Sequence, residues 1–174
     1  MKVLNITHSR LQVERIFPDL YGEICEEFLQ KDGIMLPTYK SIQKNYQYPD
    51  DVRVIMKDLI VNIETETEKI TAILKRGMLT DFGSVPKKAR SIVPYDDLKY
   101  IIAYLTHDGW FGANKGFTFG NKLLREMLRY SGVTWRKLQY VFYPVQWFGK
   151  GAYNQSQYQK ARERQFIEII REEK

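Results

Sequence analysis

The hydrophobic pattern changes its period near the middle of the chain, and this change constrains the fold more than any other feature. Residues 52–63 and 69–74 are rich in β-branched side chains and are separated by the polar segment 64–68. That arrangement predicts a β-hairpin with a longer loop. After Pro94 the apolar residues recur at helical spacing. A hairpin followed by helices predicts an α+β fold, in which a small antiparallel sheet packs against three or four helices.

Capping and breaking residues divide the second half of the chain into separate helices. We expect helices at residues 98–107 (capped by Asp96 or Asp97), 118–130 (capped by Thr118), 135–148 (capped by Thr134) and 156–172. Pro144 is expected to kink or split the third of them. The segment 109–116 holds three glycines and predicts a loop after the first helix.

The first 50 residues are less regular, and we expect residues 1–50 to form an N-terminal arm outside a core domain of residues 51–174. An apolar stripe over residues 20–28 predicts a short amphipathic helix that ends at Gly33. The stretch 37–49 is rich in Tyr and Lys and predicts a loop. We interpret this first third as a docking arm.

Composition excludes several classes of protein. At 174 residues the chain is long enough to bury a sizeable core. The single Cys25 excludes an intramolecular disulfide. No apolar run approaches the roughly 20 residues that a membrane helix needs, and no signal peptide is apparent at the start. These features predict a protein that is soluble where it is made.

The charge is unevenly distributed. Residues 1–50 carry 6 basic and 7 acidic side chains, whereas the remainder carries 21 basic and 14 acidic side chains. The basic residues cluster at Lys75, Arg76, Lys87, Lys88, Arg90, Lys122, Arg125, Arg129, Arg136 and Lys137. Such a surface suits phosphates, a polyanionic envelope, nucleic acid or an acidic protein. The alternative is a charged surface that only keeps the protein in solution.

The adjacent pair His107 and Asp108 is the strongest candidate for chemistry. Ala103, one turn before His107, leaves room beside the imidazole. Histidine is the natural general base, because its unperturbed pKa of about 6.5 lies near neutrality. The alternative is that His107 is a hydrogen-bonded structural residue.

The two candidate aspartates each allow two interpretations. Asp108 lies about 100° further round the helix than His107, so it is badly placed to orient the imidazole. It could bind a divalent cation such as calcium together with carbonyls of the segment 109–116, or it could fix the shape of that loop. Asp81 and Ser84 resemble an Asx-type turn. Alternatively, that turn closes over the end of the helix, so that Asp81, His107 and Asp108 share one site with or without a metal.

The order of these motifs resembles an uncharacterised family carried by tailed bacteriophages and prophages. The resemblance rests on T-D-x-x-S-V-P at residues 80–86, H-D at the end of a helix, and the helices that follow, over roughly residues 74–150. It implies a phage-encoded protein and brings no established activity. Members of the family usually have H-D-x-x-Y and an acidic residue early in the next helix. Here Phe111 and Asn121 occupy those positions.

The H-D-x-x-Y pattern is also similar to the arrangement in secreted phospholipases. That likeness implies that His107 is the base, Asp108 a calcium ligand and Asn121 the residue that orients the imidazole. An asparagine can accept a hydrogen bond, but it cannot stabilise an imidazolium by charge.

Together these features predict a virion-associated accessory or structural protein of the tail or baseplate, present in the host cytoplasm before assembly. Its expected partners are other virion proteins and an anionic envelope or nucleic acid, contacted through Ser84, Lys87, Lys88 and Arg125. The alternative is a small metal-assisted hydrolase that uses His107 on a lipid or cell-wall substrate.

Overall fold

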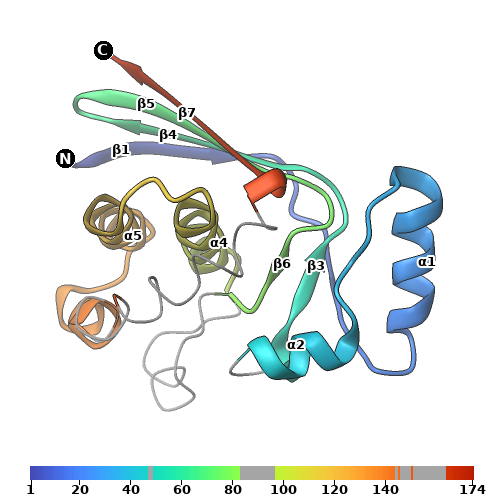
Figure 1. Ribbon diagram of the computed structural model, residues 1–174. Coiled ribbons are helices and arrows are strands. Elements are labelled where there is room, and N and C mark those ends of the chain that lie inside the picture. Colours follow the sequence, from blue (N-terminus) through green and yellow to red (C-terminus); the bar gives the residue numbers. More distant parts are fainter. Residues whose placement is uncertain (47–48, 83–96, 144, 146–149, 151–163) are drawn as a thin grey trace.

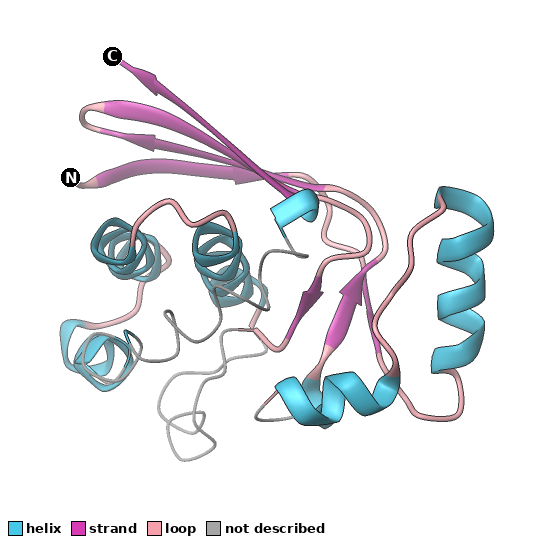
Figure 2. Cartoon of the chain, in the orientation of Figure 1, coloured by secondary structure: helices cyan, strands magenta, loops and turns pink. Residues whose placement is uncertain are grey.

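The computed structural model confirms an α+β fold in which antiparallel sheets pack against helices (Figures 1 and 2). The residues that it describes are 1–46, 49–82, 97–143, 145, 150 and 164–174. Within them the strands form one four-stranded and one three-stranded sheet. No helix among the described residues has the length and apolar character needed to cross a membrane.

The four-stranded sheet contains the predicted hairpin. Its strands lie in the order β1 (Val3–His8), β4 (Leu59–Thr65), β5 (Glu68–Leu74) and β7 (Ile167–Glu173), all antiparallel. The β4–β5 turn is shorter than the sequence predicted. The hydroxyl of Thr65 accepts the backbone N–H groups of Thr67 and Glu68, at 3.3 and 3.1 Å, and so closes a two-residue connection.

The three-stranded sheet explains why residues 52–63 are not a single strand. Its strands lie in the order β2 (Val13–Arg15), β3 (Arg53–Ile55) and β6 (Leu79–Thr80). The chain bends after β3 and then enters β4 in the other sheet. The first half of the predicted strand therefore belongs to the three-stranded sheet and the second half to the four-stranded sheet.

The first 50 residues are built into both sheets. β1 pairs with β4, and β2 pairs with β3, so the boundary expected after residue 50 runs between paired strands. The predicted amphipathic helix is confirmed as α1 (Tyr21–Asp32), which ends at Gly33 in the left-handed conformation with φ 64°. The loop predicted over 37–49 is wrong, because α2 (Tyr39–Asn45) lies within it, capped by the side chain of Thr38.

The prediction of a helix that reaches about residue 172 is also wrong at its C-terminal end. Residues 164–166 form a short 3-10 helix, and β7 follows it and pairs with β5 along its whole length. The burial of Ile167, the exposure of Glu168 and the half-burial of Ile169 have the period of a strand. The first part of that predicted helix, residues 156–163, lies outside the described residues.

Helix α4 (Leu98–Gly112) is longer than predicted, because the expected glycine loop begins inside it. A Cβ atom on Gly109 would overlap Leu74 of β5, and one on Gly112 would overlap Ile167 of β7. The two glycines therefore let the helix approach the sheet closely. Figure 1 shows α4 and α5 (Phe117–Tyr130) together beneath one face of this sheet.

Two further expectations concern the helices after α4. Thr118 lies inside α5 and does not cap it, since Gly116 precedes the helix with φ 101°. Residues 135–143 are helical, as predicted, and the kink expected at Pro144 lies outside the described residues.

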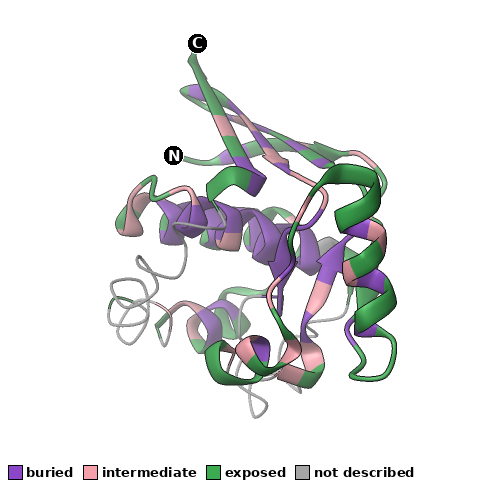
Figure 3. Ribbon diagram, turned by 45° about the vertical axis from the view of Figure 1, so that its right-hand side comes forward, coloured by how far each residue is buried: buried purple, intermediate pink, exposed green. Residues whose placement is uncertain are grey.

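The buried side chains form two clusters. The larger cluster joins the four-stranded sheet to α4, α5 and residues 133–141, and Figure 3 shows this burial concentrated along α4. The smaller cluster packs α1 and α2 on the three-stranded sheet, around Phe28, Ile42 and Val54. Val54 belongs to the smaller cluster and its neighbour Ile55 to the larger one, so β3 connects the two.

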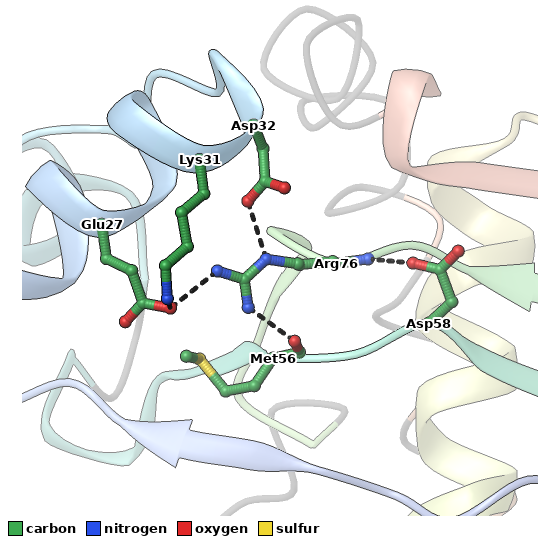
Figure 4. A network of polar contacts seen from close by, with 6 residues as sticks. All are labelled: Glu27, Lys31, Asp32, Met56, Asp58 and Arg76. Atoms are coloured by element: carbon green, nitrogen blue, oxygen red, sulfur yellow. Dashed lines mark hydrogen bonds and ion pairs between the residues drawn. The ribbon is translucent and has the colours of Figure 1, made fainter.

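Hydrogen bonds of Arg76 connect α1 to the strands (Figure 4). Its guanidinium donates to Asp32 at 2.7 Å, to Glu27 at 2.9 Å and to the carbonyl of Met56 at 2.6 Å. Its backbone N–H donates to Asp58 at 2.7 Å. The same guanidinium lies 4.0 Å from the centroid of the Phe28 ring. One residue thus links α1, the β3–β4 connection and the end of β5.

Candidate functional site

The structure brings together residues from three elements. His107 and Asp108 lie in the third turn of α4, Asn121 in the second turn of α5, and Thr80 at the end of β6. Thr80, His107 and Asn121 are all at least nine-tenths buried, with exposures of 2, 7 and 0%. Polar groups buried to this degree need defined partners.

The central contact joins His107 to Asn121. The Nε2 atom of the imidazole lies 2.9 Å from the Oδ1 atom of Asn121. With the amide oxygen assigned to this position, Nε2 carries the hydrogen and is the donor, and Oδ1 of Asn121 is the acceptor. The basic lone pair of the neutral imidazole is then on Nδ1. This bond fixes one edge of the ring against Asn121.

Asp108 is held by a residue that the sequence argument did not place in the site. The hydroxyl of Thr80 donates to Oδ2 of Asp108 at 3.0 Å. The other oxygen, Oδ1, lies 4.0 Å from Nδ1 of His107, too far for a hydrogen bond. This agrees with the expectation that Asp108 does not orient the imidazole. The signal for Thr80 was its place at the head of the T-D-x-x-S-V-P motif.

The turn after β6 is shaped by Thr80. Its hydroxyl accepts the backbone N–H of Phe82 at 3.0 Å, a side-chain turn of the kind expected instead from Asp81 and Ser84. Phe82 has φ 59°, a left-handed conformation that is rare for a bulky residue. Asp81 is buried at 5% exposure in this turn. Such strain beside buried polar groups is typical of functional sites.

Several candidate binding residues are not next to these atoms or lie outside the described residues. Ser84, Lys87 and Lys88 are outside the described residues. Arg125 lies one turn after Asn121 on α5, where it pairs with Glu126 at 3.2 Å. Its guanidinium also lies 5.3 Å from the Phe142 ring centroid. Arg125 therefore belongs to the rim beside the site, on the exposed side of α5.

Of the carbonyls of residues 109–116, which were expected to help Asp108 bind calcium, three take part in the hydrogen bonds that end α4. Residues 109–112 are helical, and the carbonyls of Gly109, Trp110 and Phe111 accept backbone N–H groups of residues 113, 115 and 114. They are therefore committed to the helix end and its turn, while calcium needs six to eight oxygen ligands. Among the described residues, no group of three His, Cys, Asp or Glu side chains could hold a metal ion.

The ring of Phe111 closes one side of the imidazole. The two ring centroids lie 4.0 Å apart at an interplanar angle of 48°. Phe111 occupies the position of the tyrosine in the H-D-x-x-Y pattern, so an apolar face replaces a hydroxyl there. The imidazole is thus fixed by Asn121 on one edge and packed by Phe111 on one face, with Nδ1 towards Asp108.

The comparisons with known proteins place the chain in one family. No curated protein and no solved structure matches it. One family model matches residues 54–145, a little over half of the chain, and this range contains Thr80, Asp81, His107, Asp108 and Asn121. The match begins about twenty residues before the region of the expected resemblance and covers β3, β4 and β5 as well. The chain therefore belongs to the family described as "Protein of unknown function (DUF1353)".

Proposed function

We propose that the chain is a small hydrolase in which His107 is the general base and Asn121 its positioning residue. The observation that carries this proposal is the 2.9 Å bond between Nε2 of His107 and Asn121. A fixed tautomer with a basic Nδ1 is what activation of a water molecule requires. Nothing in this step needs a metal ion.

The proposed reaction is the hydrolysis of an acyl ester of an envelope lipid. Nδ1 of His107 takes a proton from water while the water oxygen attacks the acyl carbon. When the tetrahedral intermediate collapses, the imidazolium returns the proton to the leaving alcohol, and a carboxylic acid and an alcohol result. Asp108, about 4 Å from Nδ1, favours the imidazolium by its charge, which partly compensates for the neutral side chain of Asn121.

The test compares two variants of the only two histidines in the chain. His107→Gln keeps a side-chain amide beside Asn121 but removes the base, so we expect at least a hundredfold loss of hydrolysis of p-nitrophenyl acyl esters. His8 is exposed on β1, and His8→Gln is expected to leave the rate unchanged. Thermal unfolding of both variants should stay close to that of the parent chain.

Asn121→Asp sharpens the same test. A carboxylate at this position stabilises the imidazolium, so the rate should rise and the pKa in the pH–rate profile should move upward. Equal rates for the parent chain, His107→Gln and Asn121→Asp would contradict the proposal. A large loss of stability in His107→Gln without any measurable activity in the parent would make His107 a structural residue.

A second proposal is that the chain is a virion-associated accessory or structural protein of a tail or baseplate, which contacts other virion proteins. The feature that supports it is the four-stranded sheet, which among the described residues is covered by helices on one face only (Figure 1). On its strands Ile60 and Ile170 are 40 and 42% exposed, as a face covered by a neighbouring subunit would be. Mass spectrometry of purified particles tests it, and absence of the chain from the particle would contradict it.

A further inference from the structure

We propose that one outer face of the protein docks on a bilayer of anionic phospholipid. The face is formed by the exposed side of α5 and by residues 135–143, at the end of the molecule away from the three-stranded sheet (Figure 1). It is called the basic face here and contains Lys122, Arg125, Arg129, Arg136 and Lys137. All five side chains are exposed.

The charge of the basic face is not balanced along the same segment. In residues 117–143 the sole acidic residue is Glu126, which is buried and paired with Arg125. On α5, Lys122, Arg125 and Arg129 follow at spacings of three and four, so they form one stripe along the helix. Within this segment of the described chain the other four cations have no acidic partner, so they suit a surface of phosphate groups.

The basic face also carries exposed aromatic side chains, which a charged surface that only keeps the protein in solution would not need. Trp135 is 69% exposed and Tyr140 is 59% exposed, whereas Leu138 and Val141 of the same helix are buried. Arg136 and Tyr140 are one turn apart and share a side of the helix. Tryptophan and tyrosine have an apolar body and a polar tip, which suits the headgroup region of a bilayer.

The two helices of the basic face are held as one unit. The guanidinium of Arg125 on α5 lies 5.3 Å from the ring centroid of Phe142. Leu138 and Val141 pack into the same core cluster as Leu124 and Met127. The two helices that carry the cations and the exposed aromatic rings are therefore packed against each other. That arrangement favours a bilayer over a single nucleic acid strand, which proteins usually bind in a basic groove.

Docking is independent of the hydrolysis proposed for His107, so the two proposals can fail separately. The experiment is co-sedimentation of the whole chain with vesicles of phosphatidylcholine, with or without phosphatidylglycerol. We expect binding to the anionic vesicles alone, and a several-fold loss of bound protein when salt rises from about 0.05 to about 0.3 M. His107→Gln should bind as the parent does.

Matched charge reversals locate the surface. Arg129→Glu with Lys137→Glu should abolish binding, whereas Lys40→Glu with Lys44→Glu, two exposed positions on α2, should reduce it far less. Trp135→Ala should weaken binding without affecting the melting temperature. Equal losses in the two double variants, or no binding to anionic vesicles, would overturn the proposal. Displacement of vesicle-bound protein by an equimolar single-stranded oligonucleotide would assign the face to nucleic acid instead and would also overturn it.

Discussion

The two halves of the molecule are stabilised in different ways. The half built on the four-stranded sheet, α4 and α5 has the larger apolar cluster and carries His107 and Asn121. The half built on α1, α2 and the three-stranded sheet has the smaller cluster and depends in addition on the polar contacts of Arg76 (Figure 4). The family match covers most of the first half, apart from β1 and β7, and excludes α1 and α2.

This difference indicates how a polar site can be kept in a fixed geometry. A buried hydrogen bond such as that between His107 and Asn121 is stabilised by the tight packing around it. Among the described residues, the α1 half is joined to the rest through β3 and through charged side chains near the surface. The following substitutions test whether the halves differ in this way.

The largest effect is expected for Phe28→Ala. Phe28 is fully buried in the smaller cluster, and loss of a buried phenylalanine side chain costs about 3–5 kcal/mol. Because β3 contributes to both clusters, we expect one cooperative thermal transition at a lower temperature. Two separate transitions, followed by circular dichroism and tryptophan fluorescence, would show that the halves unfold independently.

The next effect is that of Arg76→Gln, with its neighbour as the control. Loss of the guanidinium contacts should cost about 1–2 kcal/mol, a value kept low because the group is partly exposed. Lys75→Gln breaks only an exposed contact with Glu168 at 3.6 Å and should cost less than about 0.5 kcal/mol. Chemical denaturation of both variants measures the difference, and equal losses would contradict the role given to Arg76.

Arg76 also sets part of the pH dependence. Its hydrogen bond lowers the pKa of Glu27 below the ordinary value of 4.5. A carboxylate with a lowered pKa in the folded state contributes stability above its unfolded pKa and loses it as the pH falls. The stability difference between the parent and Arg76→Gln should therefore shrink between about pH 5 and pH 3.

Two glycines allow the same substitution to be made in each half. A Cβ on Gly120 of α5 would lie 2.8 Å from ring atoms of both Phe111 and Trp110. Gly120→Ala should therefore cost about 1 kcal/mol, although alanine favours the helix. Gly22 of α1 has no atom within 4 Å of such a Cβ, so Gly22→Ala should stabilise by about 0.5 kcal/mol. If the two variants shift the melting temperature in the same direction, the predicted difference between the two halves is contradicted.

A further test concerns Tyr104 on α4. Its buried hydroxyl has no hydrogen-bond partner among the described residues. Tyr104→Phe should stabilise the protein by up to about 1 kcal/mol. Burial, together with the neighbouring Tyr100, raises the pKa of Tyr104, so the parent loses stability as the pH rises past about 10, the unfolded value. The phenylalanine variant should lose less over the same range, as denaturation at pH 9 and 11 would show.

Local patterns predicted those elements whose own residues determine them. The strands at 59–65 and 68–74, the apolar stripe of α1 and the end of α5 at Tyr130 follow from periods that a few consecutive residues define. β7 and the last turn of α4 were mispredicted because distant partners decide them. Ile167–Glu173 becomes a strand by pairing with β5, and Gly109 and Gly112 stay helical because the sheet lies against them.

For the candidate site, the sequence by itself singled out His107, Asp108 and Asp81 as candidates, because their types and spacing are local information, whereas Asn121 followed from a resemblance to other proteins. Only the tertiary structure decided that Asn121 bonds to the imidazole, that Thr80 holds Asp108, and that the carbonyls of residues 109–111 accept N–H groups at the end of α4. The physical reason is that hydrogen bonds between elements depend on how helices and sheets pack. That packing is set by long-range contacts which no short segment encodes alone.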